Sequence, residues 1–166
     1  MRALFLDRDG VLNNLVKNRP PWKLDEIKIY QDAKMIIKYA KSKNFLPIIV
    51  TNQPDAARGS ITYKNLYEIN SFISRKLGIG PSYVCDHAHD GICECRKPKI
   101  GLLLKAQKEY NIELNKSFLI GDREKDIIAG NKAECTTIFL SKKGCKLADY
   151  SVSNHKELLF LIKKLL

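Results

Sequence analysis

The sequence lacks any long apolar run. No hydrophobic stretch approaches the roughly 20 residues that a membrane-spanning helix needs. The apolar start of the chain meets Asp7 after a few residues, which is too short for a signal peptide. We therefore expect a cytoplasmic protein with no membrane partner. Internal repeats, low-complexity tracts and linkers are also missing, so we interpret residues 1–166 as one domain.

Acidic residues are scarce relative to basic ones. The chain has 18 Asp and Glu residues against 29 Lys and Arg residues, which gives a formal net charge of +11. Such an excess can serve nucleic-acid binding, but the basic residues are scattered and no basic patch with interleaved aromatic residues occurs. We interpret the excess mainly as solvated surface and expect no nucleic-acid partner.

Cysteines are few and unevenly placed. The chain has five, an odd number, and three of them fall in one short segment, which does not suit a disulfide framework and indicates metal binding. Three thiolates and one imidazole can form a closed, structural zinc site. We predict that the loop at 85–95 binds zinc through Cys85, His87, Cys93 and Cys95. His89 is the alternative nitrogen ligand, and Cys135 and Cys145 are not expected to bind metal.

Short apolar runs alternate with amphipathic segments along the chain. The runs predict strands at 2–6, 46–50, 82–85, 117–120 and 136–140. Helical spacing predicts helices at 32–43, 62–76, 101–110, 124–131 and 154–166. The alternation predicts an α/β fold, a three-layer sandwich with a central, mostly parallel sheet. Ligands of such sheets bind beyond the carboxyl ends of the strands, where the sequence places Asp7, Thr51 and Asp122.

The end of the first predicted strand carries two carboxylates. Asp7 and Asp9 are two residues apart, and Gly10 permits the tight turn that follows. Carboxylates in this arrangement can share a hard cation such as Mg²⁺. A bound Mg²⁺ would reduce the repulsion between a carboxylate nucleophile and a phosphate ester, so the pattern favours a phosphoryl-transfer site.

These residues carry a family resemblance. Asp7-Arg8-Asp9-Gly10-Val11 resembles the first motif of the haloacid dehalogenase superfamily phosphatases, and three further motifs follow in order: Thr51, Lys97 and Gly121-Asp122 with Asp126. The resemblance implies the Rossmann-like fold of that superfamily. It also implies that Asp7 is a covalent nucleophile, that Asp9 transfers protons, and that Thr51 and Lys97 hold phosphoryl oxygens. Magnesium would bind Asp7, Asp122 and the backbone carbonyl of Asp9, with Asp126 and Arg123 in support.

The zinc loop narrows the resemblance to one branch. Cysteine ligands followed by Arg96-Lys97-Pro98, with only about 40 residues between the first two motifs, resemble the heptose-bisphosphate and histidinol-phosphate phosphatases, which have no large cap domain. The run 51–59 is similar to the heptose enzymes. The resemblance implies a monomer that removes the 7-phosphate of D-glycero-D-manno-heptose 1,7-bisphosphate for surface-polysaccharide precursors. It also implies four substrate-binding residues: Asn52, Gln53, Arg58 and Arg96.

Other functions stay open at this point. The short spacing between ligands inside the zinc loop is more similar to that of the histidinol-phosphate phosphatases. Pro54-Asp55 also departs from the sequence pattern of the heptose-bisphosphate phosphatases. A zinc-stabilised binding module without catalysis and a polynucleotide-end phosphatase are two further alternatives. The set of acidic motifs disfavours the first, and the missing basic and aromatic groove disfavours the second.

Overall fold

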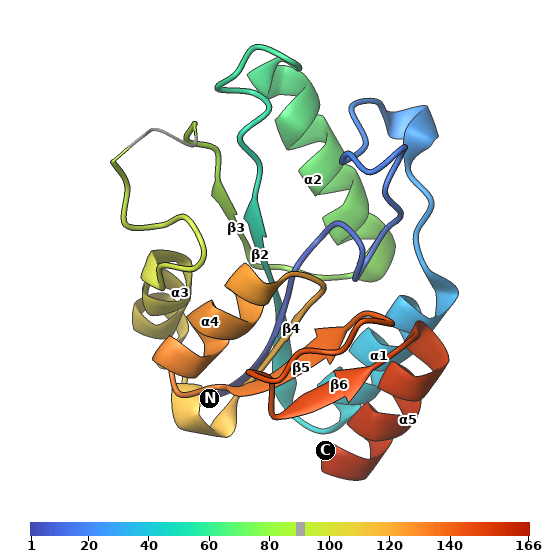
Figure 1. Ribbon diagram of the computed structural model, residues 1–166, viewed down its shortest axis with the longest axis vertical. Helices are drawn as coiled ribbons and strands as arrows, with labels where there is room; N and C mark the ends of the chain where they lie inside the picture. Colours follow the sequence, from blue (N-terminus) through green and yellow to red (C-terminus); the bar gives the residue numbers. More distant parts are fainter. Residues whose placement is uncertain (89–91) are drawn as a thin grey trace.

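The computed structural model, which describes residues 1–88 and 92–166, is built around one six-stranded sheet in the order β3-β2-β1-β4-β5-β6 (Figure 1). Every neighbouring pair of strands is parallel. The strands are β1 (Arg2–Leu6), β2 (Phe45–Asn52), β3 (Ser82–Cys85), β4 (Phe118–Gly121), β5 (Thr136–Leu140) and β6 (Tyr150–Val152). The strand order reverses between β1 and β4, which creates a crevice at their carboxyl ends.

Helices cover both faces of the sheet and make the three layers that the sequence predicts (Figure 1). They are α1 (Gln31–Ser42), α2 (Tyr63–Leu77), α3 (Gly101–Tyr110), α4 (Glu124–Lys132) and α5 (His155–Leu165), with short 3-10 helices η1 (Leu24–Glu26) and η2 (Leu114–Lys116). Strand β1 shows how two cores arise, because side chains alternate between faces. Leu4 and Leu6 pack with α1, α2 and α5, whereas Ala3 and Phe5 pack with α3 and α4.

The predicted elements are confirmed, with boundaries shifted by a residue or two. Thr62 caps α2 by accepting a hydrogen bond from the Asn65 amide, and Gly78 ends it at a φ of 64°. Pro47 lies inside β2 but before Ile49, where pairing with β3 begins, so no donor to β3 is missing at that position. The sequence prediction missed β6, because three residues, of which only Val152 is buried, show no strand period.

No large cap covers the carboxyl edge of the sheet among the described residues. The chain between β1 and α1 contains only η1 and irregular segments, which agrees with the expectation of an open site. None of the described helices has the length and apolarity to span a bilayer. The edge of the sheet where β1 and β4 end is therefore covered by loops alone.

Candidate active site

Three carboxylates meet at the crevice between β1 and β4. Asp7 follows β1, and its amide donates to the Ile120 carbonyl of β4 at 3.0 Å. Asp122 follows β4, and Asp126 lies in the first turn of α4. One carboxylate oxygen from each of the three lies within 4.8 Å of the others. The reversal of strand order thus gathers acids that are more than a hundred residues apart in sequence.

Lys97 neutralises two of these acids. Its ammonium nitrogen lies 2.7 Å from an Asp7 oxygen and 2.7 Å from an Asp126 oxygen, and it donates to the Val50 carbonyl at 2.6 Å. The side chain is 1% exposed. Burial opposes its charge, but the carboxylates of Asp126 and Asp7 outweigh burial and raise the pKa of Lys97. The ammonium thus makes two hydrogen bonds, to Asp7 and Val50, and one ion pair, with Asp126.

The backbone of Lys97 is held from β2. The Asn52 side chain accepts from the Lys97 amide at 3.1 Å and donates to the Lys97 carbonyl at 3.0 Å. This two-way contact fixes the loop that presents the lysine. Both polar atoms of the Asn52 side chain are therefore bonded within the protein. A contact between Asn52 and the substrate stays a prediction.

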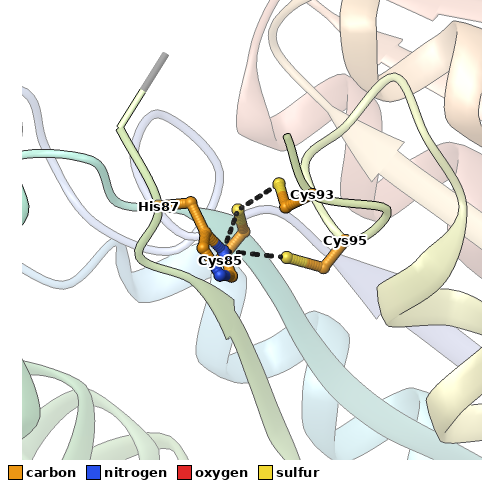
Figure 2. Close-up of side chains that lie close together, drawn as sticks. All are labelled: Cys85, His87, Cys93 and Cys95. Atoms are coloured by element: carbon orange, nitrogen blue, oxygen red, sulfur yellow. Dashed lines mark hydrogen bonds between the residues drawn. The ribbon is translucent and has the colours of Figure 1, made fainter. Parts of the chain in front are cut away.

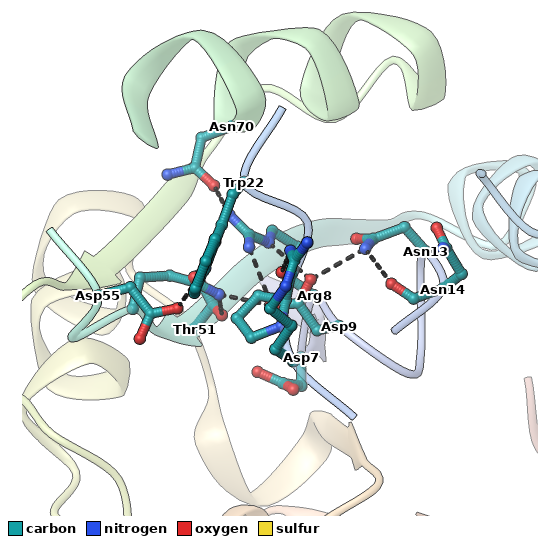
Figure 3. A network of polar contacts seen from close by, with 12 residues as sticks. Asp7, Arg8, Asp9, Asn13, Asn14, Trp22, Thr51, Asp55 and Asn70 are labelled. Carbon is teal, nitrogen blue, oxygen red and sulfur yellow. Dashed lines mark hydrogen bonds and ion pairs between the residues drawn. The ribbon is translucent and has the colours of Figure 1, made fainter. Parts of the chain in front are cut away.

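The Asp9 carboxylate is fixed by a polar network (Figure 3). One oxygen accepts from Arg8 Nε at 3.2 Å and Asn13 Nδ2 at 2.9 Å, and the other from Arg8 Nη2 at 2.9 Å and Gln53 Nε2 at 2.6 Å. Gln53 also donates to the Thr51 hydroxyl oxygen at 3.0 Å. The Thr51 hydroxyl keeps its own hydrogen for an incoming acceptor.

A cavity of about 190 Å³ opens over these groups. Asp7, Asp9, Thr51 and Asp122 line it. Three of the four residues that the sequence assigned to substrate, Asn52, Arg58 and Arg96, also line it, as does Arg123. Gln53, the fourth, is buried and contacts Asp9 instead. The cavity lining thus combines acids with several cationic groups.

The acidic cluster suits a divalent cation. Burial raises the pKa of the Asp122 carboxyl to about 7, and the neighbouring Asp7 and Asp126 add to the rise. The Asp122 Oδ1 atom is buried and has no hydrogen-bond partner within the described structure. Carboxylate oxygens are the ligands that Mg²⁺ prefers. The side chain of Asp126 joins the other two acids here, whereas the sequence had given it a supporting position.

The cysteine loop forms a second cluster (Figure 2). Cys85 Sγ lies 3.8 Å from Cys93 Sγ and 3.6 Å from His87 Nδ1, and Cys95 Sγ lies 3.2 Å from the same nitrogen. A tetrahedral zinc site places two sulfurs about 3.8 Å apart, and a sulfur and a nitrogen about 3.5 Å apart. Burial and the neighbouring thiols raise the pKa of Cys95 to about 12, so an ionised Cys95 needs a cation beside it. His89 lies outside the described residues.

Sequence reasoning missed several residues of the site, among them Arg8 and Asn70. Arg8, at 1% exposure, pairs with Asp9 and also donates to Asn70 Oδ1 of α2 at 2.7 Å (Figure 3). The sequence assigns Arg8 no role. Asn70 does leave a signal in the sequence, because it falls within the apolar stripe of α2 that includes Leu66, Ile69 and Ile73. A polar residue on a core-facing helix surface usually has a buried partner.

Comparisons with known proteins agree with this geometry. The HAD-hydrolase-like family model matches residues 94–156. The chain is 34% identical over 98% of its length to D-glycero-alpha-D-manno-heptose-1,7-bisphosphate 7-phosphatase of Campylobacter jejuni, covering 96% of that protein. It is 36% identical over 80% of its length to D-glycero-beta-D-manno-heptose-1,7-bisphosphate 7-phosphatase of Helicobacter pylori, covering 79% of that protein.

A solved structure shares the fold. The D,D-heptose 1,7-bisphosphate phosphatase of B. bronchiseptica, complexed with magnesium and phosphate, superposes with a TM-score of 0.86 at 22% identity. The match covers 99% of each chain.

We predict that Asp122→Asn stabilises the metal-free protein. The folded-state pKa of Asp122 lies above its unfolded value, so the metal-free wild type loses stability as pH rises from about 4 to 7, and the variant avoids this loss. Above pH 7 its melting temperature should be several degrees higher, since 1 kcal/mol shifts a chain of this size by roughly 2–4 °C. Thermal melts with and without Mg²⁺ measure both the gain and the loss of magnesium stabilisation. A lower melting temperature in the variant would contradict the repulsion that we describe.

We also predict that Lys97→Met strongly destabilises the fold. Removing the ammonium leaves Asp7 and Asp126 buried without their partner, which should cost about 3–5 kcal/mol. Lys116→Met is the matched control, because the exposed Lys116 side chain pairs with the exposed Glu113 at the surface, a contact worth less than about 1 kcal/mol. Urea unfolding of the two variants provides the comparison. Equal losses of unfolding free energy in the two variants would show that the buried Lys97 ion pairs stabilise the fold no more than an exposed pair does.

Proposed function

The chain belongs to the heptose-bisphosphate phosphatase family of the haloacid dehalogenase superfamily, and on that premise we propose that it removes the 7-phosphate of D-glycero-D-manno-heptose 1,7-bisphosphate through a phosphorylated Asp7. Members of this superfamily branch are phosphoric monoester hydrolases. The observation that carries the proposal is the cluster of Asp7, Asp122 and Asp126, with Lys97 paired to Asp7 and Asp126, beside a cavity that Asp7, Asp122 and several arginines line.

The acids and Lys97 prepare Asp7 for attack. We assign Mg²⁺ to Asp7, Asp122 and the Asp9 backbone carbonyl, with Asp126 beside them and Arg123 at the rim. When bound, Mg²⁺ would offset the charge of the phosphoryl group. Lys97 orients the Asp7 carboxylate through its 2.7 Å contact. Asp7 then attacks phosphorus in line, the bond to the leaving oxygen breaks, and an aspartyl-phosphate forms.

Asp9 and Thr51 complete the machinery. Asp9 lines the cavity, and its network fixes its carboxylate there. We assign it the proton given to the leaving sugar oxygen and the proton later taken from water, which attacks the aspartyl-phosphate and releases inorganic phosphate. The Thr51 hydroxyl would donate to a phosphoryl oxygen. Lys97 already donates to Asp7 and Val50 and pairs with Asp126, so we assign it mainly to holding the Asp7 carboxylate.

The substrate assignment uses the cationic groups that line the cavity. A bisphosphate has a second anionic group beyond the reacting one, and Arg58, Arg96 and Arg123 line the same cavity as Asp7 and Asp122. Guanidinium groups suit bidentate phosphate contacts. The cytoplasmic location, the monomeric state, the single domain at 1–166 and a role in surface-polysaccharide precursor synthesis are parts of this proposal.

Zinc binding by the cysteine loop is a further part of the proposal. The four ligand atoms of Cys85, His87, Cys93 and Cys95 lie within 4.8 Å of one another. The loop leads directly into Arg96 and Lys97, and Arg96 donates to the His87 carbonyl at 3.2 Å. A closed site would stiffen this segment without taking part in the reaction.

A substrate panel tests the function. We expect kcat/KM for one anomer of heptose 1,7-bisphosphate to exceed that for histidinol phosphate by roughly 100-fold or more, a ratio that lost polar contacts can produce. Phosphate should leave from C7, and Asp7→Asn should reduce turnover by on the order of 10³-fold or more while the circular dichroism spectrum is unchanged. Histidinol phosphate as the best substrate would refute the assignment, and so would full activity of Asp7→Asn.

A metal analysis tests the zinc site. Purified protein should contain about one zinc per chain, and Cys93→Ser should lose most of it because one thiolate ligand is gone. The kcat should fall by up to about 100-fold as Lys97 loses its fixed position. Cys145→Ser is the control, since Cys145 lies outside the cluster. Zinc retained in Cys93→Ser, or lost equally in both variants, would exclude this ligand set.

A further inference from the structure

The segment at 14–29, which we call the strap, lies beside the cavity and is held together by contacts among its own residues. Arg19 forms a two-pronged ion pair with Glu26, with distances of 2.7 and 3.0 Å, and its guanidinium lies over the Trp22 ring at 4.1 Å. The Trp22 amide donates to the same Glu26 carboxylate at 2.8 Å. These contacts fix the direction in which the Trp22 indole points.

The indole reaches across to a second segment. Trp22 Nε1 donates to Asp55 Oδ2 at 2.8 Å (Figure 3). Asp55 lies in the loop at 53–61, where its carbonyl accepts from the Ser60 amide at 2.9 Å. The other carboxylate oxygen lies 3.9 Å from Arg58 Nη1, a distance too long for a hydrogen bond. Trp22 thus holds one oxygen of Asp55 by a hydrogen bond, whereas the other oxygen makes only the longer ion pair with Arg58.

The position of Asp55 calls for an explanation. Its side chain is 13% exposed, and it lines the cavity together with Arg58, Arg96 and Asp7. A carboxylate beside bound phosphates is repelled by them. Asp55 can therefore favour binding of a sugar phosphate only where the substrate presents neutral hydrogen-bond donors. Sugar hydroxyls are such donors. Hydrogen bonds of this kind, with a charged acceptor, are the strong ones.

We propose that Asp55, positioned by Trp22, is a specificity residue that accepts hydrogen bonds from hydroxyl groups of the sugar. This inference rests on the proposed function, since it places a polyol in the cavity. Under this proposal the cavity makes two kinds of contact with the substrate. The cationic residues bind the phosphates. Asp55 binds the hydroxyl groups on the carbons between the two phosphates and repels an anionic group at that position.

Charge and hydroxyl recognition make opposite predictions for Asp55→Asn. Loss of a negative charge should improve binding of any phosphate ester, whereas loss of a charged acceptor should weaken binding of a polyol. We expect kcat/KM for heptose 1,7-bisphosphate to fall by about 10-fold or more, mainly through KM. For p-nitrophenyl phosphate, which has no hydroxyl groups on carbon, it should stay unchanged or rise. Activity on the second ester also shows that the variant is folded.

Two further variants complete the experiment. Trp22→Phe keeps the ring but removes the N–H donor, so it should shift the substrate ratio in the same direction by a smaller factor. Combined with Asp55→Asn, its effect should be less than multiplicative, because both act on one contact. Asp25→Asn is the matched control, since it removes an exposed carboxylate from the same strap and should leave the ratio unchanged.

The outcomes separate the inference from the proposed function. A wild type that prefers heptose 1,7-bisphosphate, with Asp55→Asn changing both substrates by the same factor, would overturn the inference and leave the function standing. Improved activity of Asp55→Asn on both substrates would do the same, because charge alone would then explain it. A wild type without preference for the sugar bisphosphate over p-nitrophenyl phosphate would overturn both.

Discussion

The buried ammonium of Lys97 between Asp7 and Asp126 is the interaction on which the rest of the structure depends. A charge this deep is tolerated only with close partners of opposite sign, and the chain supplies them from two separate elements, the end of β1 and the start of α4. The Asn52 clamp brings the lysine to them from β2. The lysine therefore ties together β2, the end of β1 and the start of α4 at the edge where the cavity lies.

The same cluster is incomplete without a cation. Lys97 offsets two acids, but Asp122 lies beside them with a buried oxygen that has no partner in the described structure. The pKa of Asp122 is raised, mainly by burial, which means that the ionised carboxylate is destabilised in this arrangement. Chains usually accept such a cost at functional sites. A bound divalent ion would remove this cost and would place positive charge beside Asp7, the nucleophile that we propose. The instability of the empty cluster and the proposed chemistry of the filled one then have the same origin.

Sequence reasoning predicted the elements and the polar residues that gather at one edge of the sheet, but not the contacts that orient them. Apolar periodicity located β1 and α2, and polar residues at strand ends located Asp7, Thr51 and Asp122, because parallel strands end at a common edge. Periodicity says nothing about strand order, so the crevice between β1 and β4 became visible only in three dimensions. The Arg8–Asp9 pair and the Trp22–Asp55 contact were also out of reach, since each depends on how irregular segments fold. Short β6 lacked any period to detect.

The central claim is that Asp7 takes the phosphoryl group. Rapid mixing with substrate and Mg²⁺ followed by borohydride reduction would convert an aspartyl-phosphate into homoserine, which peptide mass spectrometry locates. We expect homoserine at position 7, dependent on both substrate and Mg²⁺. Efficient hydrolysis with no modification at position 7, or with the modification at another acid, would contradict the account.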